Sequence, residues 1–186
     1  MLGTSSSKLD HKISTIINHI NPSGILELGC GSGKLSQLVN DKKTRLHGVQ
    51  KLFTPDDLKN LNELGYEKII DRDILDFFKE GFDEQYQLIV AMDVIEHFML
   101  SDALSIINFS LYRSDYMLLV WPSAHPQSAL TNAYDRHRCS FEIRDIVNNF
   151  DVIYYSQTGF ADFHLIHRYH IAVLRGFMNV KTIDAI

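Results

Sequence analysis

The apolar residues of this sequence follow two spacings, one typical of helices and one typical of buried strands. Between residues 8 and 20, one face of a helix carries Leu9, Ile13, Ile16, Ile17 and Ile20. The same reasoning predicts further helices over residues 34–39, 55–64, 74–79, 100–111 and 141–150. Short apolar runs predict strands over residues 25–28, 45–49, 67–70, 86–92, 116–121, 151–157 and 167–174.

Most of these expected strands are separated by an expected helix. Such alternation is typical of an α/β fold in which helices cover both faces of a mostly parallel sheet. The last two strands lack an intervening helix, so one of the seven strands is expected to be antiparallel. The 186 residues suit one domain. We expect residues 1–7 to be a flexible N-terminus and residues 8–186 to form a single domain.

Composition and charge narrow the class of protein. The hydrophobic share is 45% and the charged share 22%, which is ordinary for a globular domain. The net charge of −5 argues against nucleic acid as a partner. The sequence lacks an apolar run of membrane-spanning length, so a soluble cytoplasmic protein is expected. Two cysteines are too few for a disulfide scaffold. The oligomeric state stays open.

A glycine-rich segment directly follows the first expected strand and precedes a helix. Its residues Glu27, Gly29, Gly31 and Gly33 form an acidic-x-Gly-x-Gly-x-Gly pattern. Glycines permit a tight turn and let a ligand approach the backbone at a helix N-terminus. The segment resembles the first motif of class I S-adenosylmethionine-dependent methyltransferases, which have a Rossmann-like fold. The resemblance implies that Glu27 holds the amino-acid end of the cofactor, and that the glycines and Cys30 pass beneath it. The alternative is a tight turn without a ligand.

Two later segments extend this resemblance. After the second strand the family has an acidic residue that binds the ribose hydroxyls, and Gln50 stands there, followed by Lys51 and Leu52. An amide can bond a hydroxyl, but without the assistance of a charge. After the third strand, Asp73 and Ile74 match the residues that contact the adenine in the family. The alternative is that Asp73 only caps the next helix.

The fourth strand leads into Met92-Asp93-Val94-Ile95-Glu96-His97. This resembles the Asp-Val-(Leu/Ile)-Glu-His segment of many small-molecule methyltransferases and implies that Met92 and Asp93 line the cofactor pocket. A divalent cation is a further hypothesis, with Asp93, Glu96, His97 and His137 as ligands. Some similar proteins, including RNA 3′-terminal 2′-O-methyltransferases, bind a metal in this way. The alternative is a metal-free site.

These features together predict an S-adenosylmethionine-dependent methyltransferase that acts on a small-molecule acceptor, at an oxygen. Methyl transfer to oxygen needs a base, and we expect this to be His97, His137 or His125. One alternative is a metal-assisted RNA 3′-terminal 2′-O-methyltransferase. Another is a non-catalytic domain that binds S-adenosylmethionine, which the uncharged Gln50 favours. The glycine spacing argues against a nicotinamide-dependent oxidoreductase. The sequence does not identify the acceptor.

Overall fold

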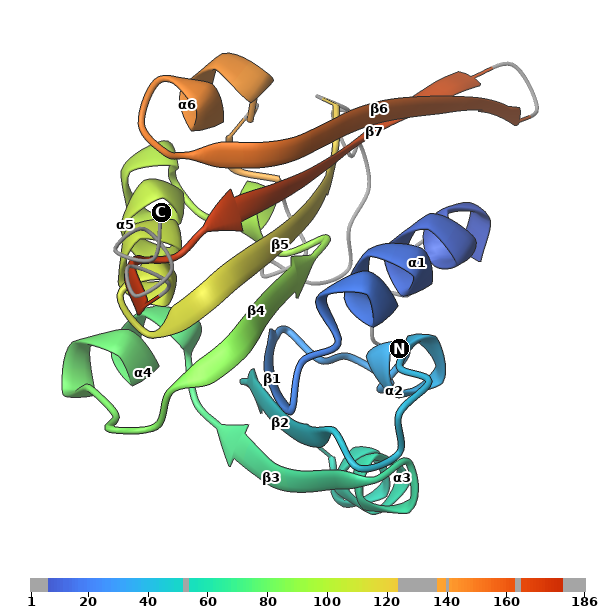
Figure 1. Ribbon diagram of the computed structural model, residues 1–186, viewed down its shortest axis with the longest axis vertical. Helices are drawn as coiled ribbons and strands as arrows, with labels where there is room; N and C mark the ends of the chain where they lie inside the picture. The colour runs from blue at the N-terminus through green and yellow to red at the C-terminus, as the bar shows by residue number, and fades with distance from the viewer. Residues whose placement is uncertain (1–6, 52–53, 124–136, 140, 163–164, 179–186) are drawn as a thin grey trace, which may run out of the picture. The chain divides into compact units, whose positions relative to one another are not determined.

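The computed structural model describes residues 7–51, 54–123, 137–139, 141–162 and 165–178 (Figure 1). The chain divides into two compact units, Met1–Val90 and Ala91–Ile186. Seven strands are hydrogen-bonded in the order β3-β2-β1-β4-β5-β7-β6. This arrangement confirms the predicted Rossmann-like α/β fold with a mostly parallel sheet. The prediction that residues 8–186 act as one domain stays a prediction.

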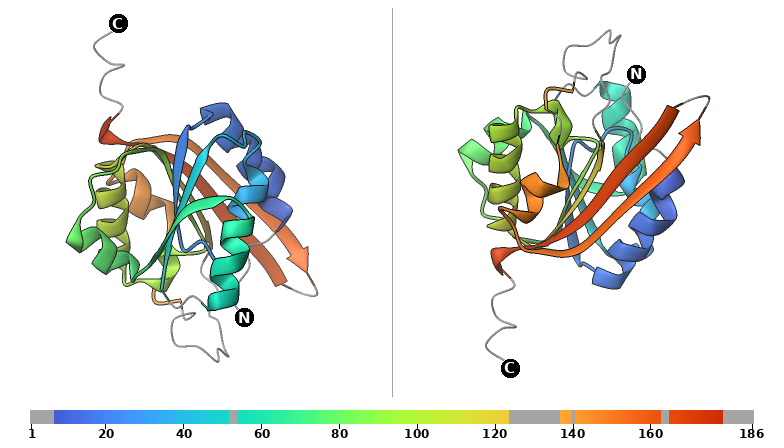
Figure 2. Two further views of the ribbon diagram at one scale, coloured as in Figure 1. Left: turned by 90° about the horizontal axis from the view of Figure 1, so that it is seen from below. Right: turned by 90° about the horizontal axis from the view of Figure 1, so that it is seen from above.

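The described part of unit 1 alternates helices and strands. Its elements are η1 (Ser7–Leu9), α1 (Asp10–Ile20), β1 (Gly24–Leu28), α2 (Leu35–Leu38), β2 (Arg45–Gln50), α3 (Pro55–Glu63), β3 (Tyr66–Asp71) and α4 (Ile74–Glu80), and it holds most of β4 (Tyr86–Met92). Within this unit, α1 and α3 lie on one side of the strands and α4 lies on the other (Figure 2). Helices therefore cover both faces of its strands, as the pattern predicts.

Local signals explain where several of these helices begin and end. In α1, Ile13 and Ile17 are buried, and the helix ends at Asn21, which has a left-handed backbone. The helix α3 begins with a reciprocal capping box between Thr54 and Asp57, and Pro55 opens its first turn. These features satisfy backbone groups that a helix end leaves unpaired.

The described residues of unit 2 include the end of β4 and form one single-turn helix, two α-helices and three further strands. Its elements are η2 (Ile95–His97), α5 (Leu100–Leu111), β5 (Ser114–Pro122), α6 (Ile143–Val147), β6 (Val152–Asp162) and β7 (Leu165–Arg175). Within this unit, α5 and α6 lie on the same side of the strands (Figure 2). The helix α6 is shorter than the predicted helix over residues 141–150, and β6 extends beyond the predicted residue 157.

The strand pairing agrees with the predicted direction of the chain. β1 pairs in parallel with β2, from Gly24 opposite Arg45 to Leu28 opposite Val49, and β2 pairs in parallel with β3. β7 is antiparallel to both of its neighbours, β5 and β6. The prediction of one antiparallel strand is therefore confirmed.

The core strands are apolar almost throughout. Every residue of β1 is buried, and so are all but one residue of β4. Strands covered on both faces have this character in α/β folds. Among the described residues, no helix has the length and hydropathy needed to cross a bilayer.

Candidate functional site

The glycine-rich loop after β1 has a backbone path that depends on glycine. Gly29, Gly31 and Gly33 all have positive φ angles, of 68°, 51° and 80°. These values lie in the left-handed region, where a side chain adds strain. A Cβ atom on Gly33 would also lie 2.7 Å from Cδ1 of Leu64. The Gly29 N–H donates to the carbonyl of Val49 at 2.8 Å, which ties the loop to β2.

Glu27 is a buried acid whose hydrogen-bond partner comes from another strand. The residue is 2% exposed, and the hydroxyl of Tyr66 in β3 donates to its Oε2 atom. Burial raises the pKa of Glu27 from 4.5 to about 8, although the hydrogen bond from Tyr66 opposes this shift. A carboxyl group with this pKa is mainly protonated at pH 7.

The strand between Glu27 and Tyr66 carries Gly48, which faces Glu27 in the register of β1 and β2. A Cβ atom on Gly48 would lie 2.8 Å from Sγ of Cys30. Cys30 is buried, and this burial together with the nearby Glu27 raises the pKa of its thiol. The contact indicates that Gly48 makes room for Cys30 beneath the loop.

Gln50 at the end of β2 contacts the glycine loop directly. Its Oε1 atom accepts a hydrogen bond of 2.6 Å from the backbone N–H of Gly31. Its buried Nε2 atom has no hydrogen-bond partner among the described residues. Gln50 therefore fixes the loop and keeps one donor for another group. Lys51 beside it is exposed, and Leu52 lies outside the described residues.

Asp73 lies at the start of α4, as the capping alternative predicts. Its Oδ1 atom accepts a hydrogen bond of 2.9 Å from the backbone N–H of Leu75. The next residue, Ile74, is buried. The cap accounts for one carboxylate oxygen of Asp73, and the predicted contact of Asp73 and Ile74 with adenine stays a prediction.

In unit 2 the chain makes a sharp turn directly after β4. Met92 is buried, and Asp93 has a left-handed φ of 54°. The N–H of Asp93 donates to the carbonyl of Val120 in β5 at 2.9 Å. The turn thereby places η2 next to the carboxyl end of β5, the edge at which open α/β sheets bind ligands. The predicted roles of Met92 and Asp93 toward a cofactor stay predictions.

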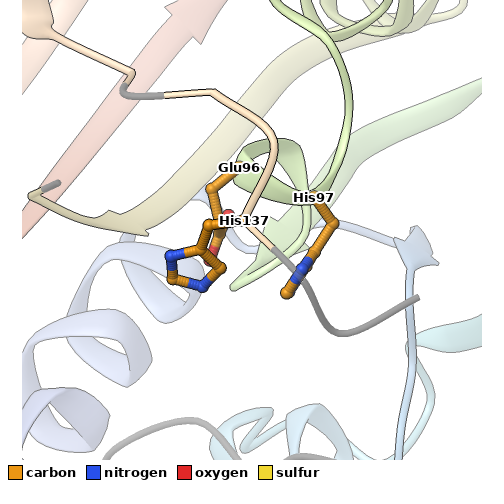
Figure 3. Close-up of side chains that lie close together, drawn as sticks. All are labelled: Glu96, His97 and His137. Atoms are coloured by element: carbon orange, nitrogen blue, oxygen red, sulfur yellow. The ribbon is translucent and has the colours of Figure 1, made fainter. Parts of the chain in front are cut away.

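Three potential metal ligands converge beside this turn. Glu96, His97 and His137 each offer a ligand atom, and these atoms all lie within 4.8 Å of one another. The centroids of the two imidazole rings are 5.0 Å apart. Figure 3 shows the three side chains pointing toward one another. The N–H of Arg138 donates to the carbonyl of Glu96 at 2.8 Å, which holds His137 near η2. Asp93, the fourth predicted ligand, is not part of this group of three.

Glu96 is as deeply buried as Glu27, but its carboxylate is not paired. It is 2% exposed, and neither of its oxygens has a hydrogen-bond partner in another residue of the described chain. Burial, and then the charge of Asp93, hold the pKa of Glu96 well above its ordinary value. Burial and the nearby Glu96 also raise the pKa of Cys139 to about 11. An unpaired buried carboxylate is costly, so this arrangement points to a missing partner.

The sequence pattern identified most of these residues but not their partners. His125, the third predicted base, lies outside the described residues. Tyr66, the hydrogen-bond partner of Glu27, was not predicted, because the pairing depends on the order of strands in the sheet. Gly48 carried a weak signal, since a glycine inside a strand often marks a close approach.

No protein-family model matches the sequence, and no curated protein matches it significantly. Solved structures do match the fold. TehB from Haemophilus influenzae is 15% identical with a TM-score of 0.67, and the match covers 92% of this chain and 63% of TehB. The N-methyltransferase NodS from Bradyrhizobium japonicum is 15% identical with a TM-score of 0.63, and the match covers 92% of this chain and 98% of NodS.

A third match is the methyltransferase domain of bacterial CtHen1. It is 19% identical with a TM-score of 0.58, and the match covers 89% of this chain and 96% of that domain. The fold is that of S-adenosylmethionine-dependent methyltransferases. At these identities the likeness concerns the fold.

Proposed function

We propose that this protein is an S-adenosylmethionine-dependent methyltransferase that acts on a small-molecule acceptor, at an oxygen. The observation that carries the proposal is the loop after β1, where the pattern Glu27-x-Gly29-x-Gly31-x-Gly33 coincides with three left-handed glycines. A loop of this path exposes backbone N–H groups and leaves room for a ligand. The similar folds of NodS and CtHen1 support the proposed methyltransferase function.

The residues of unit 1 fit the cofactor on an observation that is independent of the sequence motif. The Nε2 atom of Gln50 is a buried donor without a partner in the described chain, and a ribose hydroxyl is a suitable acceptor for it. Glu27 would hold the cofactor's ammonium group, and Asp73 and Ile74 would contact the adenine. When bound, the cofactor's sulfonium supplies an electrophilic methyl group. The chain itself supplies orientation and a base.

The proposed base for the acceptor proton is His97 or His137. Both residues lie at the carboxyl edge of the strands in unit 2, and the centroids of their rings are 5.0 Å apart. A neutral imidazole accepts a proton readily near neutral pH. His125 remains the third candidate from the sequence.

Calorimetric titration of S-adenosylhomocysteine tests the proposal. We expect micromolar binding to the wild type and a loss of about 10- to 100-fold in affinity for Glu27→Ala, the range of a hydrogen bond to a charged group. Glu63→Ala is the matched control, since Glu63 is an exposed acid in α3. Absence of binding to the folded wild type would contradict the proposal. Binding with no methyl transfer to any hydroxyl acceptor would favour the non-catalytic alternative.

The geometry of Glu96, His97 and His137 favours a second candidate, in which methyl transfer is metal-assisted. One carboxylate and two imidazoles within 4.8 Å of one another form a ligand set for a divalent transition metal. Three protein ligands leave positions open for an acceptor hydroxyl, and a bound cation lowers the pKa of such a hydroxyl. The 2′-hydroxyl at an RNA 3′ end is one acceptor of this kind.

Titration of Mn²⁺, Mg²⁺ and Zn²⁺ into the protein after treatment with a chelator tests the second candidate. We expect Mn²⁺ and Zn²⁺ to bind more tightly than Mg²⁺, because two imidazole ligands suit transition metals better than Mg²⁺. If none of the three ions gives a heat of binding, with or without S-adenosylhomocysteine, the metal-assisted candidate is wrong. The proposal of a metal-free site with His97 or His137 as the base would then stand.

A further inference from the structure

Outside the site described above, unit 2 contains a buried histidine. His170 in β7 is 3% exposed and lies opposite Trp121 in the register of β5 and β7. Its ring stacks on the indole of Trp121, with centroids 4.9 Å apart and an interplanar angle of 12°. The indole is fixed in turn, because its Nε1–H donates to the carbonyl of Phe141 at 3.0 Å. The imidazole therefore has a defined orientation.

Both nitrogens of this imidazole contact a hydroxyl. Nε2 of His170 is 2.7 Å from Oγ of Ser123, and Nδ1 is 2.8 Å from the hydroxyl of Tyr155. Burial lowers the pKa of His170, with Glu142 opposing this shift, which favours the neutral ring. A neutral imidazole has one donor and one acceptor nitrogen. The three side chains thus form a row of hydrogen bonds that runs in one direction.

The two ends of this row differ in their surroundings. Ser123 follows the last residue of β5 and is half-buried, and its N–H donates to the carbonyl of Arg168 at 2.7 Å. It is three residues beyond Val120, which accepts the hydrogen bond from Asp93. A chain of three residues spans at most about 10 Å. Tyr155, at the other end, is 39% exposed on the edge strand β6.

We propose that Ser123 and His170 form the base that removes the acceptor's proton, with Tyr155 carrying the proton on to solvent. This inference rests on the metal-assisted form of the proposed methyl transfer, in which His97 and His137 are metal ligands and not the base. The acceptor O–H gives its proton to Oγ of Ser123 as the oxygen takes the methyl group. The Ser123 hydroxyl proton passes to Nε2 of His170, and the Nδ1 proton passes through Tyr155 to water. A base of this kind is needed if His97 and His137 use their lone pairs on a metal.

A serine that is activated in this way also reacts with acyl esters, which allows a test without knowledge of the acceptor. With p-nitrophenyl acetate, Oγ of Ser123 takes the acetyl group, p-nitrophenolate leaves, and the serine proton moves to His170. We expect an acetyl group on Ser123 in the peptide mass spectrum. The rate should rise with pH and level off at a lower pH than for an ordinary histidine, because burial lowers the pKa of His170.

The variants separate a base from a merely structural histidine. His170→Gln should slow acetylation about 100-fold, the effect typical of a lost general base. Tyr155→Phe removes only the partner of Nδ1 and should slow it about fivefold, which keeps the test informative if His170→Gln does not fold. Ser105, an exposed serine in α5 whose hydroxyl bonds only to its own helix, is the control and should stay unmodified.

Two results would overturn the inference. One is acetylation of Ser123 no faster than that of Ser105, and the other is an equal rate in the wild type and His170→Gln. The binding of S-adenosylhomocysteine is measured separately on the same samples. Failure of the proposed methyltransferase function therefore shows as absent cofactor binding, whereas failure of the relay shows as an unreactive Ser123 in a protein that still binds the cofactor.

Discussion

Glu27 in unit 1 and Glu96 in unit 2 are both 2% exposed, yet their surroundings differ. Tyr66 donates a hydrogen bond to Glu27, whereas neither oxygen of Glu96 has a partner in another residue of the described chain. Burial raises the pKa of both acids. Burial alone therefore does not identify a ligand site. The unpaired carboxylate of Glu96 beside two histidines is the stronger candidate for binding a cation, whereas the paired carboxylate of Glu27 lies in β1, directly before the glycine loop.

The largest effect that we expect concerns Glu27 and pH. The folded protein holds the Glu27 proton up to about pH 8, whereas an ordinary carboxyl loses it near pH 4.5. The stability linked to this proton is therefore fully present below pH 4.5 and lost as the pH rises through 8. Glu27→Gln avoids the loss and should exceed the wild type by about 4 kcal/mol in unfolding free energy at pH 9.

Urea unfolding at pH 5 and pH 9 measures this difference. The matched control is Glu63→Gln, since that acid is 65% exposed and should not change the pH dependence. If Glu27→Gln differs from the wild type in unfolding free energy by the same amount at both pH values, the pKa of Glu27 is not raised in the folded protein.

The next effect concerns Glu96 and metal affinity. Glu96→Gln removes the only negative ligand from the group of Glu96, His97 and His137. We expect Mn²⁺ to bind about 100-fold more weakly, because replacement of even an outer-shell partner often costs 10- to 100-fold. Glu27→Gln is the matched control and should bind Mn²⁺ like the wild type. If both variants bind Mn²⁺ more weakly by the same factor, Glu96 has no specific role in binding the ion.

A smaller effect is expected if Glu27 loses the hydrogen bond from Tyr66, because its carboxyl group then lacks this partner, as that of Glu96 does. Tyr66→Phe keeps the ring but removes the hydroxyl that donates to Glu27. The unfolding free energy should fall by about 2 kcal/mol, the cost of an unsatisfied buried polar group. The pKa of Glu27 should rise further, since the hydrogen bond lowers it at present. Denaturant unfolding at pH 6 is the measurement, with Tyr112→Phe at an exposed position as the control.

The smallest effect is expected at Gln50. Gln50→Ala removes the acceptor that fixes the N–H of Gly31 at 2.6 Å. One ordinary hydrogen bond contributes about 1 kcal/mol, so the affinity for S-adenosylhomocysteine should fall about fivefold. Calorimetry on this variant and on Lys43→Ala, an exposed position, checks the value. A loss above 100-fold would exceed what the loop contact and the proposed ribose contact of Gln50 together explain.

Much of the fold was predictable because the apolar spacing directly reflects burial. The predicted strand over residues 86–92 and the predicted helix over residues 100–111 have the bounds of β4 and α5. The predicted helix over residues 141–150 is shorter in the structure, and β6 is longer than its apolar pattern. β6 gains its extra length from pairing with β7, and a single strand's spacing does not encode its partner.

The candidate site was predictable where its residues are neighbours in the chain. Glu27 and the three glycines form one local motif, and so do Glu96 and His97. Tyr66 lies 39 residues from Glu27, and His170 lies 47 residues from Ser123, so no local pattern joins these pairs. His137 was suggested by resemblance, and the structure brings it to Glu96 and His97.

Proton release on cofactor binding tests the central claim most directly. S-adenosylhomocysteine is titrated at pH 7 in buffers of different ionisation enthalpy. If Glu27 receives the ligand's ammonium group, binding makes it ionise, and we predict the release of about one proton for each ligand bound, lost in Glu27→Gln. Binding without proton release would contradict the role of Glu27. Absence of binding would contradict the proposed methyltransferase function itself.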